Sequence, residues 1–310
     1  MTIETNNEPD SGPVSGPVGG PDTGAPAVVL AVAGLRRSFS GLTAVDGIDF
    51  EVRAGEVVSV IGPNGSGKTT TLNLVSGVIR ADSGRVSLGG TRIDRSTVEE
   101  IAAAGLARTF QNGRVFGGLT VAENVEVGLY PTRRAARPLR RLARLPVLRW
   151  LALVAEVAVA LVPTRAVRAE QAEVAARVTA QLARFHERLA PRRDNQAHTL
   201  SYANRRRTEI ARALASGPRL LLLDEPTAGM NQTETAEVLD QLLALKAAGQ
   251  TMLLVEHKLD LVMALSDRVL VMDNGRIIAA GPPHQVRNDP AVIEAYLGRR
   301  RAGGSSEETA

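Results

Sequence analysis

One nine-residue stretch has the residue types and spacing of a phosphate-binding loop. Residues 62–70 read GPNGSGKTT and fit the pattern G-x-x-x-x-G-K-[ST]. Glycines let the backbone curl until several N–H groups point at one anion. Lys68 can reach the β- and γ-phosphates of a nucleotide, and the Thr69 hydroxyl can bind Mg²⁺. The nucleotide-binding residues expected here are Gly62, Pro63, Asn64, Gly65, Ser66, Gly67, Lys68, Thr69 and Thr70.

Two acidic residues end a run of four leucines further along the chain. Leu220–Leu223 are followed by Asp224 and Glu225. A buried strand would deliver both acids to its carboxyl end, beside the phosphate loop. Asp224 then suits Mg²⁺ coordination, and Glu225 is placed to polarise an attacking water. The alternative is an ordinary strand end with solvated acids, and the upstream loop argues against it.

Three more residues are candidates only in combination with this site. His257 follows the apolar run 251–255, where a residue that senses the γ-phosphate would lie. Gln111 follows Phe110, and Phe39 could stack on an adenine ring. Taken singly, His257 is an ordinary surface histidine and Phe39 an ordinary core residue.

The elements that would position these residues follow an α/β pattern. Strands are predicted at 28–32, 48–52, 56–61, 85–88, 220–224, 251–255 and 268–272. Helical patterns dominate from about 97 to 190. Asn274-Gly275 predicts a hairpin between 269–272 and 276–280, and Asp289-Pro290 predicts the start of a closing helix through Tyr296.

These patterns divide the chain into one domain and two tails. Residues 1–26 are rich in Gly and Pro and predict a disordered tail, and 299–310 predict a flexible one. Residues 27–298 form the domain, with a helical subdomain at about 97–215 inserted between two groups of strands.

Composition limits the classes of function. Hydrophobic residues at 44% and charged residues at 23% suit a soluble globular protein, and the absence of cysteine excludes disulfides and thiolate chemistry. The N-terminus lacks the pattern of a signal peptide, which favours the cytoplasm. The net charge of +4 comes from one segment, 133–168, which contains nine arginines and one acidic residue, Glu156. We therefore expect no general nucleic-acid-binding surface.

The segment 131–168 is a basic and apolar insertion. Its run from Trp150 to Val162 is apolar except for Glu156, and it is shorter than the roughly 20 residues needed to span a bilayer. It is read either as a buried helix of the helical subdomain or as an apolar helix beside an arginine-rich face on anionic lipid.

The order of these motifs resembles that of ABC-transporter ATP-binding subunits, over residues from about 28 to 298. The form is most similar to the branched-chain amino-acid importer subfamily. The stretches that carry the resemblance are 107–112 (ARTFQN), 200–202 (LSY), 209–215 (EIARALA), 228–231 (AGMN) and 295–298 (AYLG). The resemblance implies an α/β fold of the P-loop NTPase class: a RecA-like core, an antiparallel β subdomain and a helical subdomain.

The resemblance also implies roles and partners. It implies an ATPase with ATP and Mg²⁺ as cofactors, in which Phe39 stacks adenine, His257 contacts the γ-phosphate, and Gln111 couples Mg²⁺ and water to a transmembrane partner. Two subunits would enclose two ATP molecules, so that Ser201 and Ala203 of one face the ATP held by the other. The implied partners are integral-membrane permeases, a second ABC ATPase subunit and an extracytoplasmic solute-binding protein, with the chain held on the inner face of the cell membrane.

One departure affects the expected dimer. The subfamily has Gly-Gln after Leu-Ser-Tyr, and this chain has Ala203-Asn204. Glycine permits the close approach of a backbone N–H to a phosphate, whereas alanine adds a methyl group. We call residues 200–204, which would face the ATP of the other subunit, the signature segment, and we expect it to be weakened in this chain. We therefore favour a heterodimer with a related ATPase whose signature segment is intact.

Other functions stay open on the sequence alone. An ABC ATPase for another cargo, such as urea-like amides or exported lipids, would carry the same ATP-site residues. A regulatory module with impaired hydrolysis is the alternative of a different class. Ala203-Asn204 favours it, and Glu225 and His257 argue against it.

Overall fold

The structure is a computed structural model that describes residues 26–110, 115–130 and 164–303. Most of the two tails, the insertion residues 131–163 and Gln111 lie outside the described residues. The structure does not test the predictions made for these residues.

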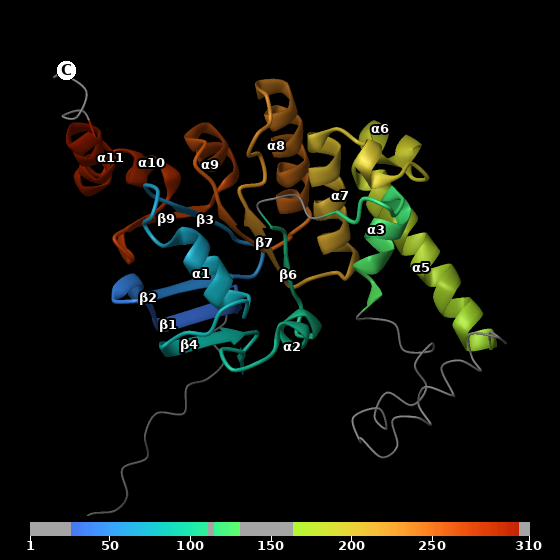
Figure 1. Cartoon of the computed structure of the whole chain (residues 1–310), viewed down its shortest axis with the longest axis horizontal. Helices are drawn as coiled ribbons and strands as arrows, with labels where there is room; N and C mark the ends of the chain where they lie inside the picture. Colours follow the sequence, from blue (N-terminus) through green and yellow to red (C-terminus); the bar gives the residue numbers. More distant parts are fainter. Residues whose placement is uncertain (1–25, 111–114, 131–163, 304–310) are drawn as a thin grey trace, which may run out of the picture.

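A six-stranded sheet forms the centre of the molecule (Figure 1). Its strands are β3 (Val57–Ile61), β6 (Leu106–Arg108), β7 (Leu220–Asp224), β8 (Met252–Val255), β9 (Arg268–Asp273) and β10 (Arg276–Gly281). Their order is β10-β9-β3-β8-β7-β6, and all neighbours are parallel except β10 and β9. The β9–β10 hairpin turns at Asn274 and Gly275, whose φ angles of 45° and 78° are those of the predicted turn.

The inner strands are apolar because both faces of the sheet are covered. In β7, Leu221 and Leu223 join one core cluster while Leu220 and Leu222 join the other. Helices α8 (Gln232–Ala247) and α9 (Leu259–Leu265) contribute to the first cluster, and α1 (Lys68–Val75) contributes to the second. The two clusters hold the strand ends, and so the site, in place.

A separate antiparallel sheet packs beside α1. It contains β1 (Val28–Phe39), β2 (Leu42–Arg53), β4 (Ser83–Leu88) and β5 (Thr91–Arg92), in the order β2-β1-β4-β5. Leu30, Val32 and Leu35 of β1 are buried in the same cluster as Leu72 of α1. This sheet is the antiparallel β subdomain that was expected.

Helices gather at the other end of the molecule (Figure 1). They are α3 (Val121–Val127), α5 (Arg165–Arg184), α6 (His186–Leu189) and α7 (Tyr202–Ala215), with short 3₁₀ turns η3 (Ala190–Arg192) and η4 (Ala197–Thr199). Helix α2 (Val98–Ala103) precedes β6. Thr97 and Thr120 close capping boxes at the starts of α2 and α3, and Thr164 caps α5.

The sequence-based boundaries differ from the structure at several places. Strands β1 and β2 are longer than the predicted 28–32 and 48–52, and two further differences affect the organisation of the domain. Strand β6 lies within the span that was assigned to helices, and it belongs to the central sheet rather than to the helical subdomain. After α10 (Pro283–Arg287), the last helix α11 (Pro290–Gly303) runs past the boundary set at 298. Residues 299–302 are good helix formers, and the glycines at 303 and 304 are the first helix breakers after them.

Candidate functional site

The predicted phosphate loop connects β3 to α1. Gly62, Gly65 and Gly67 have φ angles of 148°, 80° and 103°, which L side chains rarely adopt. The Lys68 ammonium folds over the loop and donates to the carbonyls of Gly62 and Pro63, both at 2.8 Å. The loop therefore presents a positive charge and a helix N-terminus at the same place, which is the arrangement that binds phosphate.

The other predicted residues lie at the ends of neighbouring strands. Strand β8 lies between β3 and β7, and Val255 pairs with both Val60 and Asp224. The segments that follow these three strands begin with Gly62, Glu225 and Glu256. The sheet therefore brings the phosphate loop, the two acids and the histidine segment to one edge, where ligands bind in parallel α/β sheets.

Asp224 is buried and half-paired. Its Oδ2 accepts from Arg108 Nη2 at 2.9 Å, and the two side chains are 3% and 6% exposed. Its Oδ1 is also buried and has no hydrogen-bond partner among the described residues. Burial lowers the pKa of the Arg108 guanidinium, and the bond to Asp224 opposes that shift. A buried carboxylate oxygen without a donor is an atom to which a cation can bind.

Glu225 and His257 lie near each other. His257 Nδ1 is 3.9 Å from Glu225 Oε1 and 3.8 Å from Glu256 Oε2. Glu256 is fully buried and accepts from Thr227 Oγ1 at 2.5 Å and from the His257 N–H at 2.9 Å. Glu256 thus ties the His257 segment to the turn after β7, and this fixes the spacing between His257 and Glu225.

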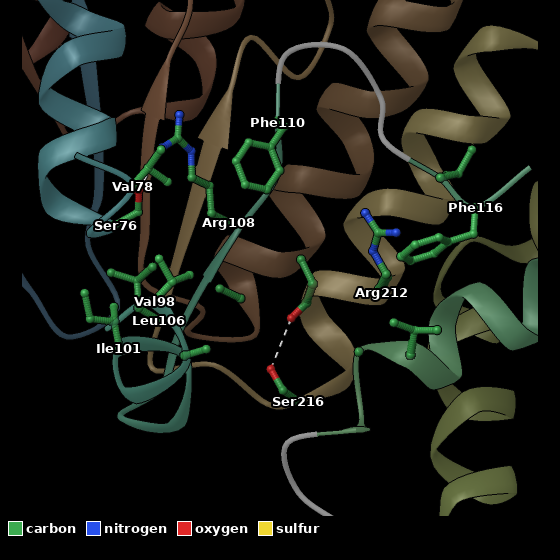
Figure 2. A pocket seen from close by; sticks show the side chains of 16 residues that line it. Ser76, Val78, Val98, Ile101, Leu106, Arg108, Phe110, Phe116, Arg212 and Ser216 are labelled. Carbon is green, nitrogen blue, oxygen red and sulfur yellow. Dashed lines mark hydrogen bonds between the residues drawn. The ribbon is translucent and has the colours of Figure 1, made fainter. Parts of the chain in front are cut away.

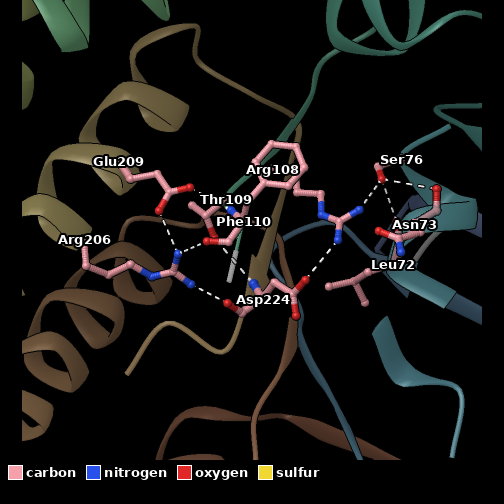
Figure 3. A network of polar contacts seen from close by, with 9 residues as sticks. All are labelled: Leu72, Asn73, Ser76, Arg108, Thr109, Phe110, Arg206, Glu209 and Asp224. Atoms are coloured by element: carbon pink, nitrogen blue, oxygen red, sulfur yellow. Dashed lines mark hydrogen bonds and ion pairs between the residues drawn. The ribbon is translucent and has the colours of Figure 1, made fainter. Parts of the chain in front are cut away.

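A second buried pair ties α7 to the site (Figure 3). Arg206 Nη1 donates to Glu209 Oε2 at 2.7 Å, and both side chains are 1% exposed. Arg206 also donates to the carbonyls of Phe110 and Asp224, while Glu209 Oε1 accepts from the Phe110 N–H at 2.7 Å. The start of the segment that contains Gln111 is therefore held from α7.

A pocket of about 490 Å³ opens beside this network (Figure 2). Its walls come from α2, β6, α3 and α7 and are mainly apolar, with Arg108 and Arg212 as the charged members. Val98, Phe116 and Val127 are 47%, 52% and 37% exposed at this pocket. Large apolar side chains left exposed around one hollow are typical of a surface that binds another protein.

The remaining candidates occupy separate positions. Phe39 ends β1 and is 42% exposed, with the Arg37 guanidinium 4.7 Å from the ring centroid. Ser201 caps α7 and accepts from the Asn204 N–H at 3.4 Å. Helix α7 lies in the helical part of the molecule, away from the phosphate loop of the same chain (Figure 1).

Ala203, where the sequence predicts a weakened contact with the nucleotide of a partner subunit, is buried within its own subunit. Its side chain is 2% exposed and belongs to a core cluster of apolar residues. The Asn204 amide oxygen accepts from Arg207 Nη1 at 2.9 Å. The methyl group therefore packs inward, and the first turn of α7 keeps its backbone N–H groups.

The C-terminal helix also reaches the loop. Tyr296 packs on the apolar cluster that contains Ile61, the residue before Gly62. Burial raises the pKa of the Tyr296 phenol, and a backbone hydrogen bond with Gly62 opposes the shift.

Sequence reasoning gave no role to Arg108, Arg206, Glu209 and Glu256. Arg108 and Glu209 lie in stretches already singled out (107–112 and 209–215), and Arg206 lies between two of them. The available signal was an arginine or a glutamate inside an apolar helical or strand pattern. Glu256 directly precedes His257, and its contact with Thr227 joins residues 29 positions apart in the sequence.

Comparisons with known proteins agree with this geometry. The ABC transporter family matches residues 45–228, and a family described as branched-chain amino acid ATP-binding cassette transporter matches residues 276–302. The high-affinity branched-chain amino acid transport ATP-binding protein LivG of Salmonella typhimurium is 38% identical over 272 residues, which cover 87% of this chain and 98% of that protein. BraF of Pseudomonas aeruginosa, which has the same description, is 37% identical over 271 residues, with the same coverage.

Solved structures give the same result for the fold. An ATP-binding cassette of an ABC transporter in its ADP conformation has a TM-score of 0.70 and 32% identity, and the match covers 87% of this chain and 99% of that one. A nucleotide-free cassette from an ABC transporter has a TM-score of 0.69 and 31% identity, with coverage of 87% and 98%.

Proposed function

The chain belongs to the ATP-binding subunits of ABC transporters, and on that premise we propose that it hydrolyses Mg²⁺-ATP to power import of branched-chain amino acids. The observation that carries the ATPase role is the shared sheet edge of the phosphate loop, Asp224, Glu225 and His257. The cargo is supported by the match of residues 276–302 and by the names of the relatives.

The loop and its neighbours would hold the nucleotide. Backbone N–H groups of residues 62–70 and the Lys68 ammonium bind the phosphates, and the exposed Phe39 ring stacks on the adenine. Thr69 and Asp224 are the ligands for Mg²⁺. The described residues contain no group of three His, Asp or Glu side chains that could hold a metal ion. A site of this kind suits Mg²⁺, which is usually bound by only one or two protein side chains together with phosphate oxygens of the substrate.

Each remaining residue has one task. The metal would neutralise the negative charge on the phosphates. Glu225 accepts a proton from the attacking water, and His257 donates to the γ-phosphate. Gln111, which follows Phe110 in the sequence, orients the water and couples it to the membrane partner; the main chain of Phe110 is held by Arg206 and Glu209.

The membrane partner docks on the apolar pocket of Figure 2. No helix of the described part of the chain has the length and apolar character to cross a bilayer. The exposed side chains of Val98, Phe116 and Val127 offer apolar contact, and Phe110, the residue before Gln111 in the sequence, also lines the pocket. A permease segment seated there holds the chain on the inner face of the membrane.

Two ATPase subunits enclose the nucleotides in this proposal, and the second is a related ATPase. The N-terminal turn of α7, with Ser201 and the N–H of Ala203, faces the ATP of the partner subunit. The heterodimer is supported by the departure at Ala203-Asn204. The Ala203 methyl packs inward, which argues against a clash between this methyl and the nucleotide of the partner. The heterodimer therefore rests on Asn204, whose side chain is shorter than the glutamine of the subfamily.

Uptake tests the cargo. Proteoliposomes that contain the permeases, this chain, its partner ATPase and the extracytoplasmic solute-binding protein are expected to accumulate labelled leucine when ATP is enclosed. The same vesicles with Lys68→Ala should accumulate none. Accumulation of an amide or export of a lipid, with no leucine uptake, would assign a different cargo to the same ATPase.

ATPase rates test the pairing. The mixed pair is expected to hydrolyse ATP several-fold faster than the isolated chain, and Ala203→Gly with Asn204→Gln should raise the rate of the isolated chain. Rapid hydrolysis by the unmodified isolated chain would reject the heterodimer and leave the ATPase role intact.

A further inference from the structure

Arg108 is a buried arginine with two fixed anchors, and the proposed mechanism gives it no role. Its Nη1 donates to Ser76 Oγ at 2.7 Å, and its Nη2 donates to Asp224 Oδ2 at 2.9 Å (Figure 3). The side chain is 6% exposed. A planar guanidinium held at two nitrogens cannot rotate, so it fixes the direction of the carboxylate that it contacts.

The Asp224 carboxylate is fixed so that one oxygen is occupied and the other is not. Arg108 takes Oδ2, while Oδ1 is buried without a hydrogen-bond partner in the described part of the chain. The Asp224 main chain is also held, because its carbonyl accepts from Arg206 and its N–H donates to Thr109 Oγ1 at 3.4 Å. The freedom left to this residue is small, and Oδ1 is the atom available to a cation.

The other anchor connects Arg108 to the phosphate-loop helix. Ser76 is the C-cap residue of α1, and its Oγ donates to the Leu72 carbonyl at 2.7 Å. Helix α1 begins at Lys68, so the proposed metal ligand Thr69 lies in its first turn. Arg108 therefore sets the position of Asp224 relative to the helix that presents Thr69.

We propose that Arg108 is a positioning residue for the metal: by occupying Oδ2 of Asp224 and bracing it against α1, it presents Oδ1 to the Mg²⁺ that accompanies the nucleotide. This inference rests on the proposed function, because it takes Asp224 as a metal ligand. Residues that orient a metal ligand typically change metal affinity about 10- to 100-fold when they are removed.

A purely structural role makes a different prediction. If Arg108 only filled space and paired a buried charge, its loss would weaken nucleotide binding with and without metal to the same degree. If it positions Asp224, the loss is confined to the part of the affinity that the metal adds. The two roles are separated by binding, without any measurement of hydrolysis.

The experiment measures the affinity of the full chain for a fluorescent ADP, once with excess Mn²⁺ and once with EDTA. We expect Arg108→Met to lower the Mn²⁺-dependent gain in affinity about 10-fold or more, while the affinity in EDTA stays within about 2-fold of the unmodified chain. Ser76→Ala keeps the contact with Asp224 and removes the brace, so it should lower the gain by less. Arg108→Lys keeps the charge and loses the two-point contact, and it should fall between the two.

Arg268→Met is the matched control. Arg268 is a partly buried arginine that pairs with Glu56 at 2.7 Å, at the beginning of β9 on the opposite edge of the same sheet. Its loss should leave the Mn²⁺-dependent gain unchanged. Thermal unfolding of each variant shows that it is folded, and Ser76→Ala provides the test should Arg108→Met not fold.

The outcomes are distinct. The inference would be overturned if Arg108→Met lowered the affinity for ADP equally in Mn²⁺ and in EDTA. It would also be overturned if both Arg108→Met and Ser76→Ala kept the full Mn²⁺-dependent gain in affinity. Asp224→Asn serves as the reference: if it removes the gain and the Arg108 and Ser76 variants do not, the inference fails alone. If the unmodified chain gains nothing from Mn²⁺, the proposed metal site fails, and the inference with it.

Discussion

Glu225 adopts a backbone conformation that glutamate normally avoids. Its φ is 47°, in the left-handed region, which costs an L residue roughly 1–2 kcal/mol. The Glu225 N–H donates to the Val255 carbonyl at 2.9 Å, and the Glu225 carbonyl accepts from the Ala228 N–H at 3.1 Å. These bonds stabilise the strained turn. Strain of this kind gathers at functional sites, where it aims a side chain in a direction that relaxed backbone would not.

Glu225→Gln should therefore separate binding from hydrolysis. The amide has the same shape and cannot accept the proton of the attacking water, so we expect turnover to fall about 100-fold or more while ATP stays bound. Trapped ATP should stabilise the dimer, which size-exclusion chromatography with ATP would detect. Glu51→Gln, at an exposed position of β2, is the control. Unchanged hydrolysis in Glu225→Gln would remove this residue from its assigned role.

The sequence predicted those site residues that stand in a local pattern of residue types. Four leucines before Asp224 and Glu225 indicate a buried strand that ends in acids, and the strand is where it was predicted. Glu256 could not be assigned in this way. Its contact with Thr227 joins residues on two different strand ends, and only the pairing of β7 with β8 brings them together.

The phosphate loop depends on close contact between elements as well as on glycine's backbone freedom. A Cβ at Gly67 would lie 2.3 Å from the Ala44 carbonyl oxygen at the start of β2, a distance that real Cβ atoms do not reach. Gly65 also has a positive φ, yet a Cβ there meets nothing within 4 Å. A side chain at Gly67 would therefore meet both a steric clash and backbone strain, whereas one at Gly65 would meet backbone strain alone.

Gly67→Ala should be far more damaging than Gly65→Ala. The first variant must displace backbone, so we expect a loss of several kcal/mol in the free energy of unfolding and loss of ADP binding. The second adds only the cost of a left-handed alanine, about 1–2 kcal/mol. Urea unfolding and ADP titration measure both effects. Equal destabilisation of the two variants would mean that the contact with β2 relaxes freely.

The elements that the sequence missed are those with little local pattern. Strand β6 has three residues, too few for a period to be visible, and it pairs with β7 across more than a hundred positions. The hairpin at Asn274-Gly275 was predicted because its turn chemistry is local. The same contrast explains why the phosphate loop was found from its sequence and the Arg108–Asp224 pair was not.

At the scale of the whole molecule, one side is organised around the pocket between the sheet and the helical part. The pocket is lined by Arg108 and Phe110 of the β6 segment and by Arg212 of α7, and the Arg212 guanidinium lies 5.4 Å from the Phe116 ring centroid. A partner seated there contacts both parts of the molecule at once. Since Arg206 and Glu209 hold the main chain of Phe110, we expect a movement of α7 to displace Phe110 as well.

Charge placed at the pocket should therefore release the permeases without harming the ATP site. We expect Val98→Asp and Phe116→Asp each to weaken co-purification with the permeases by about 10-fold or more, because an apolar contact at the centre of an interface is replaced by a solvated charge. Affinity for ADP should stay within about 2-fold. Ile293→Asp is the matched control, since Ile293 on α11 is 46% exposed and Val98 is 47% exposed. Retention of the permeases by both pocket variants, or their equal loss with Ile293→Asp, would place the membrane contact on another surface.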